Sequence, residues 1–133
     1  MLEKYNDTPA AIAIILYTLG CAFYVFQLLF MTESWLAENG MGPETVGLAR
    51  VLAFTWLGIL VGLVRTFTNG PDGNSTFFIV LIVAQLGLVL NLWHQYLFPA
   101  DAAAAATVLD DSIAVSVLAL LLLIGWFRLR ARL

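Results

Sequence analysis

The chain has 133 residues, of which 62% are hydrophobic and 11% charged, and its formal net charge is -3. Four membrane spans of about 20 residues each would use most of this length, which excludes a separate soluble catalytic or nucleic-acid-binding domain. The single cysteine, Cys21, excludes an intramolecular disulfide and a dithiol redox mechanism. We therefore expect one domain, residues 1–133, forming an all-α integral membrane four-helix bundle.

The first apolar stretch begins at Asp7-Thr8-Pro9 and carries no charge before Glu33. An Asp or Thr N-cap followed by proline at the first helical position is typical of a helix start. The stretch exceeds the about 20 residues that cross the hydrocarbon core. It predicts a span at about 9–31, with an amphipathic extension to Glu38 that ends at Asn39-Gly40.

Three further spans are expected, at about 46–67, 77–97 and 112–127. Pro43-Glu44 places a proline and an acid in the first turn of the second span. The residues from Asn69 to Gly73 are typical of a turn, and Ser75 or Thr76 is expected to cap the third span. The alanine-rich segment from 101 to 107 fits either an interfacial helix or the first turns of the last span.

The distribution of Lys and Arg predicts the orientation. With four spans, both termini and the loop between the second and third spans share one side. That side carries five of the six basic residues: Lys4, Arg65, Arg128, Arg130 and Arg132. The other side carries Arg50 with six acids: Glu33, Glu38, Glu44, Asp101, Asp110 and Asp111. We therefore expect antiparallel spans with both termini cytoplasmic, in a bacterial-type inner membrane.

Small residues let membrane helices approach one another closely. The positions expected to pack against neighbouring helices are Gly20, Gly58, Gly62, Ala84, Gly87 and Ser116. Gly58 and Gly62 form a G-x-x-x-G pair, which favours packing within the bundle. The alternatives are a homodimer contact and docking on a larger partner.

Polar residues within the spans gather toward the acidic side, and they define the candidate ligand-binding set: Gln27, Arg50, Asn91, His94, Asp110 and Asp111. Gln85 lies nearer mid-span and is the exception. Ionisable groups at membrane depth usually face a partner or water, so Arg50 is expected to pair with Asp110 or Asp111.

Three interpretations of this set remain open. The residues snorkel or staple neighbouring helix ends, or they line an outward-opening pocket for a lipid, quinone or other amphipathic molecule. In the third, His94 is an axial ligand to a haem or chlorophyll pigment. No spacing of acids predicts a dedicated metal site, and no cofactor is required by the sequence.

Three segments carry a resemblance: the first span, the amphipathic stretch from Glu33 to Gly40, and Ala49-Arg50 followed by Leu57-Gly58-Ile59-Leu60-Val61-Gly62. Together they resemble small four-span bacterial membrane proteins of the DoxX-like group. The resemblance implies a four-helix bundle and no particular chemistry. Similar bundles that isomerise sterols carry embedded acids, which this chain lacks.

No span has an acid near its centre, which argues against a proton relay, and no serine-histidine-acid or H-E-x-x-H pattern occurs. The sequence therefore predicts a non-catalytic membrane protein, an accessory or assembly subunit of a larger membrane complex. Its expected partners are membrane lipids and other membrane protein subunits, and no nucleic acid. The alternative is a lipid-, quinone- or pigment-binding protein that uses the candidate ligand-binding set.

Overall fold

The computed structural model describes residues 2–99 and 102–133, with side chains described at 4–99 and 108–133. Every regular element in this part of the chain is helical. Two 3₁₀ turns, η1 (Leu2–Tyr5) and η2 (Pro43–Thr45), accompany five α-helices: α1 (Thr8–Phe30), α2 (Thr32–Glu38), α3 (Val46–Asn69), α4 (Ser75–Leu97) and α5 (Ala102–Leu129). Four stretches are long and apolar enough to cross a membrane: Thr8–Phe30, Pro43–Asn69, Ser75–Leu97 and Val108–Leu129.

The start of α1 confirms the predicted cap. Asp7 is the N-cap, and its Oδ1 accepts a hydrogen bond of 2.8 Å from the Ala10 N–H, with Pro9 in the first turn. The other end of α1 differs from the expected continuous extension. The helix breaks at Met31, and the amphipathic stretch forms the separate α2, which Gly40 follows at a φ of +67°.

Two other boundaries correct the sequence-based expectation. Asn74, rather than Ser75 or Thr76, is the N-cap of α4. It makes no side-chain cap hydrogen bond, and its Nδ2 donates to the Pro71 and Asp72 carbonyls of the turn. The α5 backbone is helical from Ala102, so the alanine-rich segment from that residue is continuous with the last long helix. Asp101 lies outside the described residues.

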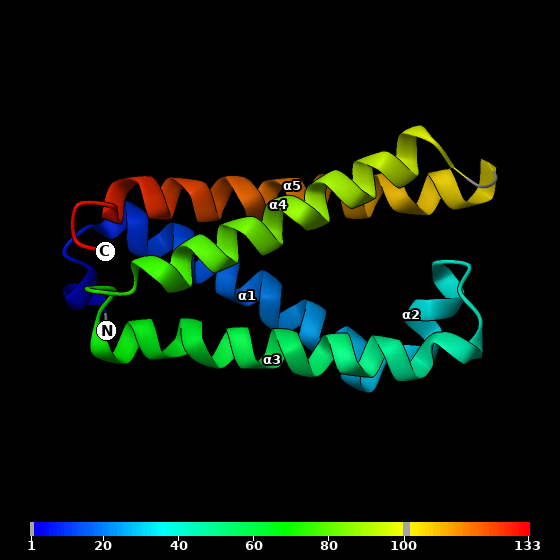
Figure 1. Ribbon diagram of the computed structural model, residues 1–133, viewed down its shortest axis with the longest axis horizontal. Helices are drawn as coiled ribbons and strands as arrows, with labels where there is room; N and C mark the ends of the chain where they lie inside the picture. Colours follow the sequence, from blue (N-terminus) through cyan, green and yellow to red (C-terminus); the bar gives the residue numbers. More distant parts are fainter. Residues whose placement is uncertain (1, 100–101) are drawn as a thin grey trace.

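The long helices pack as two arms. In Figure 1, α1 runs obliquely through the molecule and packs on both α3 and α5, while α4 packs along α5. α3 and α4 follow one another in the chain, yet they make few contacts beyond their connecting turn. The pairs α4–α5 and α1–α3 therefore separate away from the end that holds both termini (Figure 1).

The core lies where α1 crosses its neighbours. Its fully buried side chains include Ile14, Tyr17, Leu63, Leu81 and Leu122. Large apolar side chains on the outer surfaces, such as Phe23 at 63% and Leu90 at 71% exposure, remain uncovered. An apolar exterior around an apolar core is what a helix bundle needs when its surroundings are lipid.

Candidate functional site

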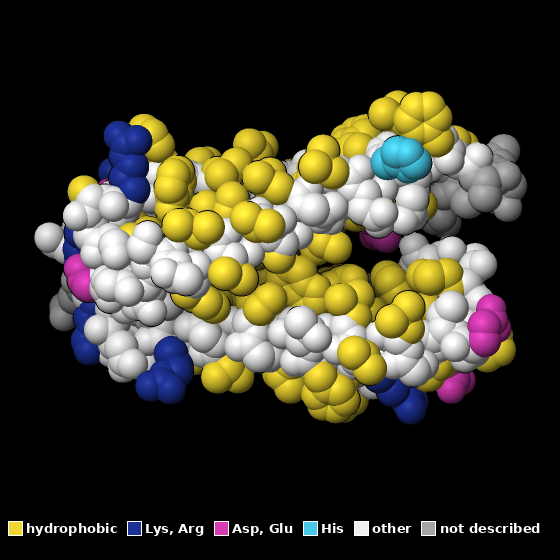
Figure 2. All heavy atoms as spheres, in the orientation of Figure 1, with side chains coloured by type: hydrophobic (Ala, Val, Ile, Leu, Met, Phe, Trp, Pro, Cys, Tyr) yellow, Lys and Arg dark blue, Asp and Glu magenta, His cyan; other side chains and the backbone are white. Residues whose placement is uncertain are grey.

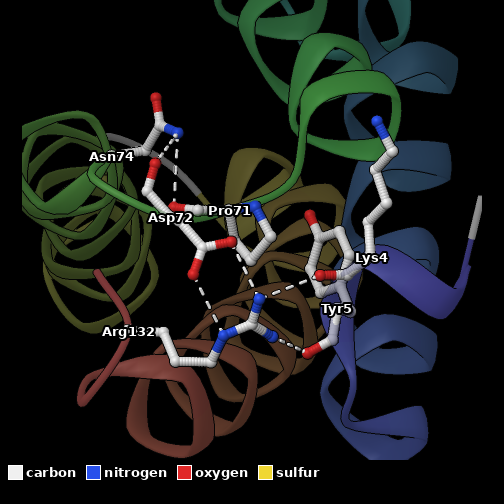
Figure 3. A network of polar contacts seen from close by, with 6 residues as sticks. All are labelled: Lys4, Tyr5, Pro71, Asp72, Asn74 and Arg132. Atoms are coloured by element: carbon white, nitrogen blue, oxygen red, sulfur yellow. Dashed lines mark hydrogen bonds and ion pairs between the residues drawn. The ribbon is translucent and has the colours of Figure 1, made fainter.

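The end of the molecule that holds both termini is closed by a network of polar contacts around Arg132 (Figure 3). The Arg132 guanidinium donates from Nε to Asp72 Oδ1 at 3.1 Å and from Nη2 to Asp72 Oδ2 at 2.8 Å. It also donates to the backbone carbonyls of Lys4 and Tyr5. One side chain thus joins the start of the chain, the α3–α4 turn and the tail after α5. We call this group of contacts the terminal clamp.

The Tyr5 side chain extends the terminal clamp to α3 through its contacts with Phe67 and Thr66. The Tyr5 ring stacks on Phe67 with centroids 5.4 Å apart, and its hydroxyl shares a hydrogen bond with the Thr66 hydroxyl. Burial raises the pKa of the Tyr5 hydroxyl, more than the Thr66 hydrogen bond lowers it. Tyr5 is therefore neutral at physiological pH and acts as a buried hydrogen-bonding anchor.

Asp7 has two roles at the same end. Besides capping α1, its carboxylate accepts hydrogen bonds from Arg128 Nε at 2.8 and 3.0 Å. The Arg128 hydrogen bond, followed by the one from Ala10, lowers the pKa of this carboxyl. The pair fixes the start of α1 against the end of α5, and both groups stay charged at neutral pH.

At mid-height the bundle contains one buried polar side chain that joins three helices. Gln85 of α4 is only 2% exposed. Its Oε1 accepts a hydrogen bond of 3.1 Å from the Tyr17 hydroxyl of α1, and its Nε2 donates to the Val115 carbonyl of α5 at 2.9 Å. Sequence reasoning placed Gln85 near mid-span without assigning it a role. The structure shows an amide whose oxygen and nitrogen each have a hydrogen-bond partner, so it cross-links the core.

In the described part of the chain, the opposite end of the molecule is open. Figure 2 shows it hollowed between the α4–α5 pair and the arm of α2 and α3, with hydrophobic side chains along the seam between α3 and α4. Aromatic groups stand on both sides of this opening. On one side, the Tyr24 ring of α1 meets Trp35 of α2 and Trp56 of α3 edge-on. On the other side, Trp93 meets Tyr96 edge-on on α4. Trp93 also donates to Ser116 at 2.9 Å, which joins α4 to α5.

The candidate ligand-binding residues lie on four different helices near this open end. Gln27 and Asp111 are half-buried, whereas Arg50, Asn91, His94 and Asp110 are exposed. No hydrogen bond or ion pair joins any two of them within the described part of the chain, and the expected pairing of Arg50 with Asp110 or Asp111 is not formed. The structure thus leaves this set dispersed.

The residues expected to pack between helices divide into two groups. A Cβ placed on Gly20 would lie 2.4 Å from Leu118 Cδ2, and one on Gly62 would lie 2.7 Å from the Phe77 ring, so both glycines are covered. Ser116 accepts the Trp93 hydrogen bond and Ala84 is half-buried. A Cβ on Gly58 or Gly87 would meet nothing within 4 Å. The prediction that these two glycines pack inside the bundle is therefore not met.

A cavity of about 290 Å³ lies at the closed end, between the last turns of α3 and the first turn of α4. Its lining combines apolar and polar groups: Gly62, Arg65, Thr66, Asn69, Gly70, Asn74 and Phe77. The candidate ligand-binding set did not include any of them. Arg65 and the turn residues were read from the sequence only as orientation and turn signals, and their convergence depends on how α3 and α4 meet.

Within the described residues, no group of three or more His, Cys, Asp or Glu side chains is arranged to hold a metal ion. His94 is exposed on α4, with its ring centroid 5.0 Å from that of Phe98.

Comparisons with models of known protein families, with curated proteins and with solved structures give no match. The resemblance to the DoxX-like group therefore stays a prediction, and function is argued from the residues themselves.

Proposed function

We propose that this chain is a small non-catalytic subunit of a larger membrane complex, in which it crosses a bacterial-type inner membrane four times as an antiparallel bundle. The observation that carries the proposal is one exposed side of α4, between the middle of the helix and the open end. Gly87, Asn91 and His94 lie at spacings of four and three residues, so they share one side of the helix. All three are exposed, whereas the opposite side of α4 contains the buried Phe78, Leu81 and Gln85.

Asn91 is the most informative member of this face. It lies six residues before the end of α4 at Leu97, or about 9 Å along the helix axis at 1.5 Å per residue. Its short side chain cannot extend to the aqueous boundary as a lysine or arginine does. A polar group at this depth is costly when it faces lipid alone, and it usually contacts a partner.

Gly87 gives the same face a place for close approach. Because a Cβ there would meet nothing within 4 Å, the α4 backbone is accessible to an apposed helix. Small residues at such positions let two membrane helices pack closely and exchange hydrogen bonds. A partner transmembrane helix with its own polar side chain, packed along Gly87 and Asn91, accounts for both features.

The distribution of charge supports the orientation in this proposal. Lys4, Arg65, Arg128 and Arg132 lie at the closed end, which we place on the cytoplasmic side under the positive-inside rule. The open end then faces outward. Labelling of Gly40→Cys from outside intact cells, and no labelling of Ala131→Cys, is the expected result in a Cys21→Ser background. The reverse pattern would invert the orientation.

Gentle detergent extraction followed by native mass measurement tests the subunit proposal. We expect a partner at fixed stoichiometry, lost when Asn91→Leu and His94→Leu are combined. Thr55→Val is the matched control, because Thr55 is an exposed polar residue of α3 whose hydroxyl already donates to the Val51 carbonyl of its own helix. A strictly monomeric species, or equal loss of the partner in the control, would contradict the proposal.

A further inference from the structure

The cavity between α3 and α4 lies at the end of the molecule opposite the proposed partner face. Its volume of about 290 Å³ is at the small limit of ligand sites, which run from about 300 to 1,000 Å³. It therefore has room for a head group and the beginning of a chain, rather than for a whole large ligand.

The charged member of the cavity lining is Arg65. It lies four residues before the end of α3 at Asn69, about 6 Å along the helix, which places its guanidinium at the level of lipid head groups. Both carboxylates described at this end are already engaged, Asp7 by Arg128 and Asp72 by Arg132. Arg65 has no acidic partner among the described residues. A guanidinium in this situation favours phosphate, which it binds through two parallel hydrogen bonds.

The apolar part of the cavity lining comes from Gly62 of α3 and Phe77 of α4. Figure 2 shows hydrophobic side chains continuing along the seam between these two helices toward the open end. Since α3 and α4 make few contacts beyond their turn, the seam is accessible from the side, where acyl chains of a bilayer would lie.

We propose that this cavity binds one anionic phospholipid, with the phosphate at Arg65 and Asn69 and the start of one acyl chain against the Phe77 ring, which packs on Gly62. Charge complementarity favours this occupant, because one cavity combines an arginine that has no acidic partner among the described residues with the apolar Phe77 ring. The site would hold α3 and α4 together where the protein itself provides few contacts. It does not depend on the partner face of α4, so either proposal can fail alone.

The test uses the full chain in detergent with added dioleoylphosphatidylglycerol or dioleoylphosphatidylcholine, and native mass spectrometry measures the bound lipid. We expect preferential retention of one phosphatidylglycerol. Arg65→Ala should weaken it about ten-fold, the loss expected when a charge-assisted contact to phosphate is removed, and Arg65→Lys should weaken it less. The matched control is Arg130→Ala, which removes the same charge at the same end but from a side chain that lies over the Phe127 ring, outside the cavity.

The outcomes separate a built site from general attraction. Arg130→Ala should keep affinity within about two-fold of the unmodified chain. Equal losses in Arg65→Ala and Arg130→Ala, or equal retention of the two lipids, would overturn the proposal. Water-soluble glycerol phosphate at the same concentration should not displace the lipid. Displacement would show that the head group alone binds, which would overturn the proposed acyl-chain contact. Unchanged thermal unfolding of lipid-free Arg65→Ala, expected because the side chain is exposed, excludes misfolding as the cause.

Discussion

The two ends of the bundle are built differently. At the closed end, the single side chain of Arg132 connects the start of the chain, the α3–α4 turn and the tail. The ion pair between Asp7 and Arg128 adds a second connection. At the open end, the polar residues Arg50, Asn91 and His94 are exposed and dispersed, and the two arms separate. Among the described residues, polar contacts between distant parts of the chain thus concentrate at the closed end, whereas exposed polar side chains lie toward the open end, where we propose that a partner binds.

The largest expected difference is between a packed glycine at the closed end and an uncovered glycine in the middle of α4. A Cβ on Gly125 would lie 2.4 Å from Ile14 Cδ1, whereas one on Gly87 would meet nothing within 4 Å. We expect Gly125→Val to lower the free energy of unfolding by about 2 kcal/mol, as overpacking does, and Gly87→Val to change it by less than about 0.5 kcal/mol. Thermal unfolding in detergent measures both. Equal effects would mean that the two glycine positions are equally packed.

The terminal clamp should be the next most sensitive. Arg132→Ala removes the hydrogen bonds to Asp72 and to the Lys4 and Tyr5 carbonyls, and we expect a loss of about 1 kcal/mol, because the Asp72 side chain is 59% exposed and water screens the pair. His94→Ala, at the open end, should change stability by less than about 0.5 kcal/mol. A stable Arg132→Ala variant would show that the clamp is dispensable and that core packing alone closes this end.

The amide of Gln85 lies between the two ends, and its replacement tests the coupling of the arms. Gln85→Leu leaves the buried Tyr17 hydroxyl without its acceptor, and we expect a loss of about 1 kcal/mol, the range seen for hydrogen bonds between membrane helices. Because the cost comes from the unpaired hydroxyl, Tyr17→Phe combined with Gln85→Leu should recover part of it. Additive losses in this double-mutant cycle would argue against a coupled pair.

The smallest effect is an acid dependence of stability at the closed end. The pKa of the Asp7 carboxyl is lowered by Arg128 and Ala10. The stabilisation is therefore fully present above the pKa of an unfolded aspartate, about 3.9, and is lost as the pH falls through the lower folded value. Unfolding curves should keep this contribution from neutral pH to about pH 4, and Asp7→Asn should remove its pH dependence. An unchanged acid profile in Asp7→Asn would assign the dependence to other groups.

Local signals in the sequence predicted local structure well. Asp7-Thr8-Pro9 indicated the start of α1 correctly, and four apolar stretches indicated four long helices. These features depend on residues close together in the chain, so nothing distant alters them. The break at Met31 and the Asn74 cap were missed because, at a helix end, the hydrogen bonds of the adjoining turn compete with those of the helix. This competition shifts the boundary by one or two residues.

Side-chain pairings were less predictable, for a physical reason. Gly58, Gly62 and Gly87 look alike in the sequence, but only Gly62 is covered, because coverage depends on how two helices cross. The role of Gln85 likewise requires knowing that Tyr17 and Val115 lie at the same height. In an apolar helix every face is hydrophobic, so the pattern that identifies the buried side of a soluble helix is missing.

The position of Gln85 has a consequence for how the bundle is assembled during synthesis. Segments leave the ribosome in chain order, at about 5–20 residues per second, so α1 and α4 are made before α5. Because α4 packs mainly along α5, the Gln85 amide cannot donate to the Val115 carbonyl until α5 has been made. This hydrogen bond therefore stabilises the completed bundle rather than the segments that are made first.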